Sequence, residues 1–118
     1  MDATEVLSVV GALGLAAMAA PLLVRPQLVE KLGVTAIDGN GWLELRGIYG
    51  GLLLALAVTC LVTREPYAFL TAGVALLGFA ATGFVSLAVD HPRVPQGLAV
   101  NAAHTLLGLL LLAGFWGW

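Results

Sequence analysis

Four long apolar runs dominate this chain of 118 residues. They cover residues 6–24, 43–62, 68–89 and 98–118. A helix needs about 20 apolar residues to cross the hydrocarbon core of a bilayer, and each run is close to this length. Each run is also apolar on all sides, unlike an amphipathic surface helix. The sequence therefore predicts an all-α protein that crosses the membrane four times.

The composition and the connectors predict how these spans are organised. Only 10% of the residues are charged and 60% are hydrophobic, whereas soluble domains carry about 25% charged residues. The connectors 63–67 and 90–97 are short, so we expect residues 1–118 to form one domain, an up-down bundle of four transmembrane helices. The longer connector 25–42 mixes apolar and charged residues after Pro26, which predicts a short helix at the membrane interface.

Loop charges predict the orientation and exclude one class of partner. Three basic residues lie in the connectors 25–42 and 90–97, against Arg64 alone on the side of the termini. By the positive-inside rule these connectors face the cytoplasm, and both termini are periplasmic if the protein lies in a bacterial cytoplasmic membrane. The net charge of −2 offers no basic surface for nucleic acid. We expect membrane lipid as a partner and no nucleic acid.

Six polar side chains gather toward one end of the predicted bundle. Glu44, Arg46 and Tyr49 open the second span, Asp90 closes the third, and Asn101 and His104 open the fourth. An ionisable residue within a membrane span is costly and is a candidate for function. Asn101 and His104 also share one stripe of the fourth helix with Gly97 and Gly108. The pattern predicts a polar cavity that opens at the cytoplasmic end and has an apolar floor.

Each of these residues also has a structural explanation. The helix dipole favours the carboxylate of Glu44 in a first turn, and Arg46 can extend to lipid phosphates. Asp90 can end a helix in water, whereas Asn101 and His104 can hydrogen-bond between helices. Their joint position at one end is the reason for a functional interpretation.

Small residues recur every four positions in two of the spans. They are Gly47, Gly51, Ala55 and Thr59 in the second span and Ala12, Ala16 and Ala20 in the first. Such stripes let helix backbones approach closely. We expect them to serve packing within the bundle, with a homo-oligomer interface as the alternative.

Metal and haem sites are not expected. Cys60 is the only cysteine and lies in an apolar run, and His104 is the only histidine within a span. A single histidine supplies one axial ligand, and a lone cysteine cannot form a metal-binding pair. We therefore expect neither a metal nor a cofactor.

The run from Glu44 to Gly51, Glu-Leu-Arg-Gly-Ile-Tyr-Gly-Gly, resembles a motif of a known family. Together with the four-span layout and Asp90, it is similar to a domain-of-unknown-function branch of the DoxX-like small bacterial membrane proteins. The resemblance covers residues 43 to about 115. It implies a four-helix membrane bundle in which this motif opens the second helix. Because that branch lacks a settled activity, the resemblance implies a fold and a place for a site but no reaction.

The first function hypothesis is a protein that binds a lipophilic small molecule, such as a quinone, isoprenoid or sterol-like compound. In an enzymatic version, Glu44, Asp90 or His104 is the acid or base of an isomerisation, epoxide opening or cyclisation. Arg46 holds an oxygen function or developing negative charge of the ligand. Tyr49 and Asn101 complete the predicted set of ligand-binding residues.

Two further hypotheses come from other classes. The protein is a non-catalytic accessory or assembly subunit of a larger membrane complex, docked through its small-residue faces. Alternatively, it is a small proton-coupled transporter, since four-span chains of this length resemble small multidrug transporters. Those transporters carry a carboxylate in the middle of the first helix, whereas residues 6–24 contain no ionisable residue.

Overall fold

Helices make up almost the whole of the described chain. The computed structural model describes residues 2–32, 34–90 and 94–117, and within these ranges it contains no strand. Three helices are long and apolar enough to cross a membrane: α1 (Ala3–Val24), the continuous helix Gly39–Thr63, and α4 (Pro66–Val89). A shorter apolar stretch, Leu98–Ala113, lies within α5 (Val94–Ala113). The all-α prediction is confirmed, and the helices have the length and apolarity of an integral membrane protein.

Two of the predicted spans differ in detail from the observed helices. The helix Gly39–Thr63 begins before the predicted span 43–62 and has three parts, α2 (Gly39–Leu45), the π-helix η2 (Arg46–Leu52) and α3 (Leu53–Thr63). For the predicted span 98–118, α5 ends at Ala113 and a 3₁₀-helix, η3 (Gly114–Gly117), follows. Residue 118 lies outside the described residues, as do residues 91–93, which include one of the basic residues that support the orientation.

The predicted short helix in the first connector is present as a 3₁₀-helix, η1 (Pro26–Leu32). Pro26 and Val29 are buried, whereas Glu30 and Lys31 are exposed. The apolar side of η1 therefore packs onto the protein, where η1 contacts α1, η2 and α5.

Local sequence signals explain where the helices begin and end. Asp2 caps α1, because its carboxylate accepts hydrogen bonds from Thr4 Oγ1 at 2.6 Å and from the Glu5 N–H at 2.9 Å. These two bonds lower the pKa of Asp2. Asp38 caps α2 in the same way. Arg64 ends α3 in the left-handed conformation, with φ of 55°.

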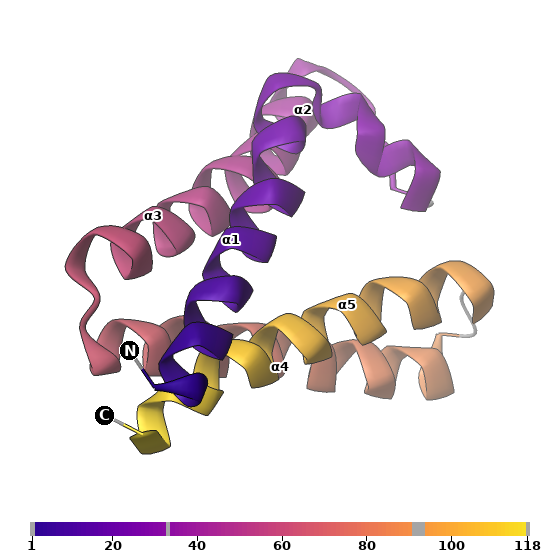
Figure 1. Cartoon of the computed structure of the whole chain (residues 1–118). Coiled ribbons are helices and arrows are strands. Elements are labelled where there is room, and N and C mark those ends of the chain that lie inside the picture. Colours follow the sequence, from indigo (N-terminus) through magenta and orange to yellow (C-terminus); the bar gives the residue numbers. More distant parts are fainter. Residues whose placement is uncertain (1, 33, 91–93, 118) are drawn as a thin grey trace.

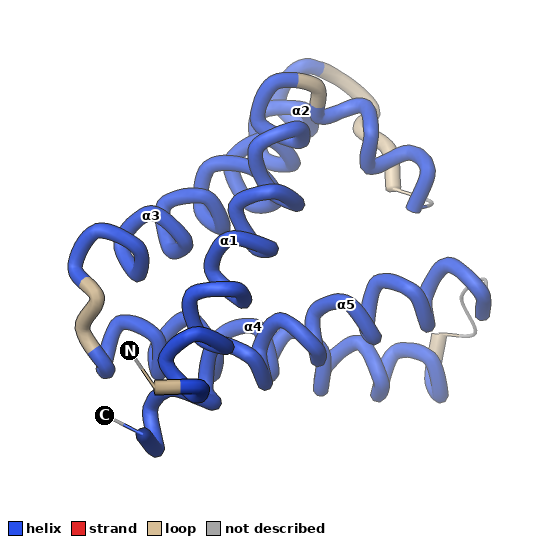
Figure 2. The backbone as a smooth tube through the Cα atoms, viewed as in Figure 1, coloured by secondary structure: helices blue, strands red, loops and turns tan. Residues whose placement is uncertain are grey.

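The helices form two pairs, which we call the first and the second arm. The first arm is α1 with the helix Gly39–Thr63, and the second arm is α4 with α5. Figure 1 shows the arms meeting near the chain termini and diverging toward the end where α1 finishes and α5 begins. Figure 2 shows how short the loops between the helices are. The core lies where the arms meet, and its large buried side chains include Leu15, Phe69, Leu76 and Leu111.

Large apolar side chains cover the outside of both arms. Exposed examples are Leu13, Val58, Val74, Phe84, Leu106 and Leu109. So many exposed apolar side chains would form extensive hydrophobic patches in water, whereas lipid tails solvate them without cost. The outer surface of the fold therefore suits a bilayer.

A buried hydroxyl joins the arms where they meet. The Ser8 hydroxyl of α1 donates to the carbonyl of Leu111 at 2.7 Å and accepts from the N–H of Gly114 at 2.7 Å. The last carbonyl groups of a helix have no hydrogen-bond partner inside that helix. The Ser8 hydroxyl is the partner of one of these carbonyls at the end of α5. This contact fixes the first turns of α1 against the end of α5.

Replacing Ser8 with alanine is expected to destabilise the fold by about 1 kcal/mol, since the Gly114 N–H then loses its buried acceptor. Denaturation by sodium dodecyl sulfate in mixed micelles measures this loss. Ser86→Ala is the matched control, because the hydroxyl of Ser86 donates to Asp90 at an exposed helix end. Equal stability of the two variants would contradict the role assigned to Ser8.

Candidate ligand-binding site between the two arms

Tyr49 lies in the middle of the π-helix η2, within the motif singled out in the sequence. A π-helix is wider than an α-helix, and single π-turns are frequent at functional sites. The widened helix passes close to α1 at Gly50. Glycine is needed there because the two backbones lie too close together for a side chain. A Cβ atom built on Gly50 lies 2.6 Å from Cα and N of Leu23. The π-helix therefore fixes both the contact with α1 and the position of Tyr49.

His104 faces Tyr49 from the second arm, with an aromatic ring between them. The ring of Phe79, on α4, lies 4.6 Å from that of His104 and 6.3 Å from that of Tyr49, both in edge-to-face geometry. Edge-to-face contacts of this kind are favourable and orient the rings. The three rings belong to three different helices, so they connect the two arms.

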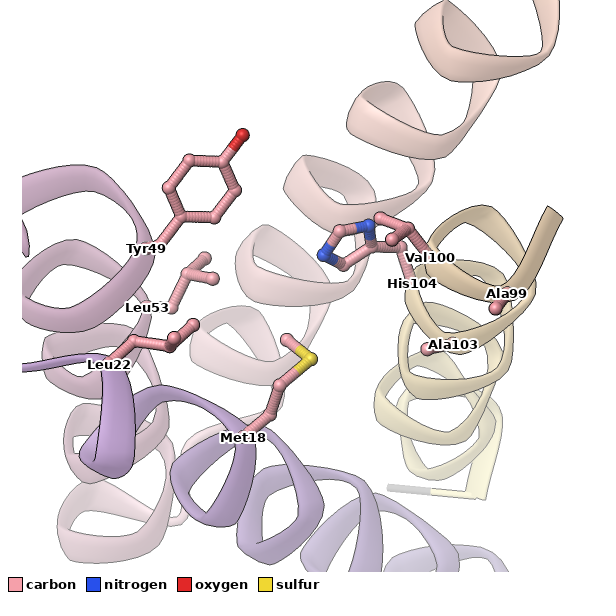
Figure 3. A pocket seen from close by; sticks show the side chains of 8 residues that line it. All are labelled: Met18, Leu22, Tyr49, Leu53, Ala99, Val100, Ala103 and His104. Carbon is pink, nitrogen blue, oxygen red and sulfur yellow. The ribbon is translucent and has the colours of Figure 1, made fainter. Parts of the chain in front are cut away.

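A pocket of about 210 Å³ lies between the arms next to these rings, and we call it the inter-arm pocket. Its lining consists of the polar rings of Tyr49 and His104 and six apolar side chains, Met18, Leu22, Leu53, Ala99, Val100 and Ala103. Figure 3 shows Tyr49, Leu53 and Leu22 on one side and His104 with the residues of α5 on the other, with Met18 pointing into the space between. An apolar wall with few polar groups is typical of small-molecule sites.

His104 is the buried polar group of this pocket. Its side chain is 3% exposed, and Nδ1 has no hydrogen-bond partner within the described chain. Most buried polar atoms in native proteins have a partner, so an exception requires an explanation. Two of its neighbours in the lining, Ala99 and Ala103, are small, so they leave space beside the ring.

Asn101 lies one turn before His104 on α5 but faces α4 more closely. It is 4% exposed, and its Nδ2 also lacks a partner within the described chain. The nearest α4 residue is Gly83, where a Cβ atom would overlap Oδ1 of Asn101 and lie 2.6 Å from its Cγ. Gly83 is therefore the reason that α4 and α5 can enclose this amide.

The other three predicted site residues lie elsewhere. Glu44 lines a separate cavity of about 410 Å³ beside α2, together with Asp38. Arg46 is exposed on the surface of η2. The carboxylate of Asp90 accepts a hydrogen bond of 2.6 Å from Ser86 at the exposed end of α4. Of the six residues, the structure thus brings Tyr49 and His104 together in one pocket and places Asn101 beside it.

Sequence reasoning missed the apolar half of the site. Met18 and Leu22 of the lining, and Phe79 against the ring of His104, lie within uniformly apolar spans, so their sequence surroundings resemble those of lipid-facing neighbours. One feature of the sequence could have pointed to Phe79. It lies four residues before Gly83, so both residues are on the same face of the helix. That face meets α5, where Asn101 and His104 lie three residues apart.

Acidic, histidine and cysteine side chains do not form a metal-binding cluster in the part of the chain that the structure describes. No three of them lie close enough together there to hold an ion. The chemistry that the inter-arm pocket offers is therefore that of one imidazole, one phenol and an apolar wall.

No protein-family model, curated protein or solved structure matches this chain, so the resemblance to the DoxX-like proteins stays a prediction from the sequence.

Proposed function

We propose that this chain is a membrane protein that binds a lipophilic small molecule in the inter-arm pocket. The observation that carries the proposal is that the imidazole of His104, which is 3% exposed, lines a pocket whose wall is mostly apolar. Burying a polar ring in an apolar wall costs stability, and such costs concentrate at functional sites. A molecule with an apolar body and a polar end fits this combination of groups.

Binding is better supported than acid and base catalysis. Of the three residues expected to transfer protons, only His104 lines the pocket, while Glu44 and Asp90 lie outside it. An isomerisation, epoxide opening or cyclisation would thus depend on His104 with the hydroxyl of Tyr49. A carrier or sensor of the molecule needs neither proton donor nor base.

Filling the pocket tests this proposal. In Ala103→Leu the added carbons occupy the space between Met18 and His104, so the variant is expected to lose the bound molecule. Ala102→Leu is the matched control, because Ala102 is the neighbouring alanine of α5 but is exposed and does not line the pocket. The measurement is mass spectrometry of the lipophilic compounds that co-purify with each protein in mild detergent.

We expect Ala103→Leu to retain about one tenth of the compound that the wild type retains, and Ala102→Leu to retain as much as the wild type. A tenfold loss corresponds to about 1.4 kcal/mol of binding free energy. Equal retention by all three proteins would refute the proposal. The absence of any compound above the lipid background in the wild type would refute it as well.

A second candidate function, an accessory or assembly subunit, is supported by one observation. The stripe of small residues on the helix Gly39–Thr63 faces away from the chain, since Gly47, Ala55 and Thr59 are exposed. No atom outside its own turn lies within 4 Å of a Cβ built on Gly47. Such a face suits another membrane helix, in a second copy or in another subunit. Stoichiometric co-purification with another chain, lost in Ala55→Leu and kept in Ala81→Leu, would favour this candidate.

For the membrane arrangement we propose four crossings in an up-down order, the fourth by α5. The proposal is supported by the apolar stretch Leu98–Ala113, which is shorter than the other spans, and by the antiparallel packing of α4 and α5. We further propose a bacterial cytoplasmic membrane with both termini periplasmic, and membership of the DoxX-like proteins. The loop charges and the Glu44–Gly51 motif support these points.

A further inference from the structure

The two ring nitrogens of His104 have different surroundings. Nδ1 is buried and has no hydrogen-bond partner within the described chain. In Figure 3 the nitrogen farther from the backbone, Nε2, is directed across the pocket toward the side where Tyr49, Leu53 and Leu22 lie. One nitrogen is therefore enclosed by protein and the other is offered to whatever occupies the pocket.

This difference decides which nitrogen carries the hydrogen. At neutral pH an ordinary histidine is mostly uncharged, and the uncharged ring has one N–H donor and one acceptor nitrogen. In protein backbones, buried N–H groups without an acceptor are rarer than buried carbonyls without a donor, and we apply the same preference to the ring nitrogens. The hydrogen is therefore placed on Nε2, where a ligand can accept a hydrogen bond from the N–H group. The enclosed Nδ1 is then the acceptor nitrogen.

The rest of the lining sets the charge of the ligand. The other polar ring, Tyr49, lies on the opposite side of the pocket, and the remaining six lining side chains are apolar. Among the described residues, a carboxylate or phosphate here would find no lysine or arginine in the lining, since Arg46 is exposed outside the pocket. A neutral acceptor oxygen avoids this cost.

We infer that the ligand of the inter-arm pocket is an uncharged lipophile whose carbonyl oxygen accepts a hydrogen bond from Nε2–H of His104. This inference rests on the proposed binding function and adds the chemical class of the ligand. It also assigns His104 as the donor that orients the molecule, with its apolar body against Met18, Leu22 and Leu53.

Nitrogen NMR tests the position of the hydrogen without any ligand. The chain has two histidines, so His91→Gln leaves His104 as the only ¹⁵N-histidine signal. At neutral pH we expect a pyrrole-type shift for Nε2 and a pyridine-type shift for Nδ1. The reverse assignment, or two protonated nitrogens, would overturn the inference while leaving the binding proposal intact.

Two isosteric probes test the carbonyl preference. They are 2-acetylnaphthalene and 2-isopropenylnaphthalene, which differ by an oxygen in place of a methylene group. Both are titrated into phosphatidylcholine nanodiscs with the full chain, and protein-free nanodiscs correct for partition into lipid. We expect the ketone to bind about fivefold more tightly, the effect of one net hydrogen bond. In His104→Phe, which keeps a ring but has no donor, the two probes should bind equally.

The outcomes separate the two claims. Equal affinities of the wild type for both probes, both lost in Ala103→Leu, would overturn the carbonyl inference and support the binding function. If neither probe binds above the protein-free background, both claims are overturned. A ketone preference that persists in His104→Phe would remove His104 as the donor.

Discussion

Replacing Gly50 with alanine is expected to destabilise the protein by about 3 kcal/mol. The added Cβ would lie 2.6 Å from two backbone atoms of Leu23, and backbone atoms cannot turn aside as the end of a flexible side chain can. Overpacking of this kind costs about 1–3 kcal/mol and occasionally more. The higher helix propensity of alanine offsets at most about 1 kcal/mol. The π-helix and α1 must then separate, which also displaces Tyr49.

Gly47→Ala is the matched control for this prediction. Gly47 lies in the same π-helix, but a Cβ there meets no atom within 4 Å. We expect the control to be as stable as the wild type or more stable by up to about 1 kcal/mol. Unfolding in mixed micelles measures both variants. If Gly50→Ala were as stable as Gly47→Ala, the contact between α1 and η2 would not be as close as described.

Gly83→Ala is expected to produce the second large effect, because its Cβ would overlap the amide of Asn101. Either the amide leaves its buried position or α4 and α5 move apart, at a cost of about 2 kcal/mol. Since Phe79 and His104 meet one turn away, ligand binding should weaken together with stability. Thermal unfolding and probe binding in nanodiscs measure the two effects.

Two comparisons isolate the cause. Gly78→Ala places the same methyl group on α4 where nothing lies within 4 Å, so its stability should match or exceed that of the wild type. Asn101→Ala in the Gly83→Ala background removes the amide that the methyl group meets. The double variant should therefore recover most of the lost stability, as expected of two residues in contact. Additive losses in the double variant would show that the amide is not the obstacle.

The sequence predicts the helices well because length and apolarity decide which segments can cross a bilayer. It could not predict the π-helix, and this affects the packing face. Counting every four residues along a regular helix places Gly47, Gly51 and Ala55 on one face and suggests that this face packs inside the bundle. In the structure Gly50 is buried instead, while Gly47 and Ala55 face outward. The stripe in α1 fits the expectation better, because Ala12 is buried in the core.

The site was predictable to the extent that polar residues are conspicuous in apolar helices. Tyr49 and His104 were singled out for this reason, and the structure places both in the inter-arm pocket. The grouping of Glu44 with them could not be tested from the sequence, because it depends on how far the arms diverge. The contact of Ser8 with α5 joins the two arms, and the contact of Gly50 with α1 joins the helices of the first arm; both are tertiary interactions.

Photochemical labelling tests the central claim, that the inter-arm pocket binds a lipophilic molecule, most directly. A naphthalene that carries a trifluoromethyl diazirine is irradiated with the protein in nanodiscs, and the labelled residues are identified by mass spectrometry. We expect labels on Met18, Leu22 and the segment 99–104, and we expect 2-acetylnaphthalene to suppress them. Labels confined to outward-facing positions such as Leu13, Leu106 and Leu109, and unaffected by the competitor, would contradict the account.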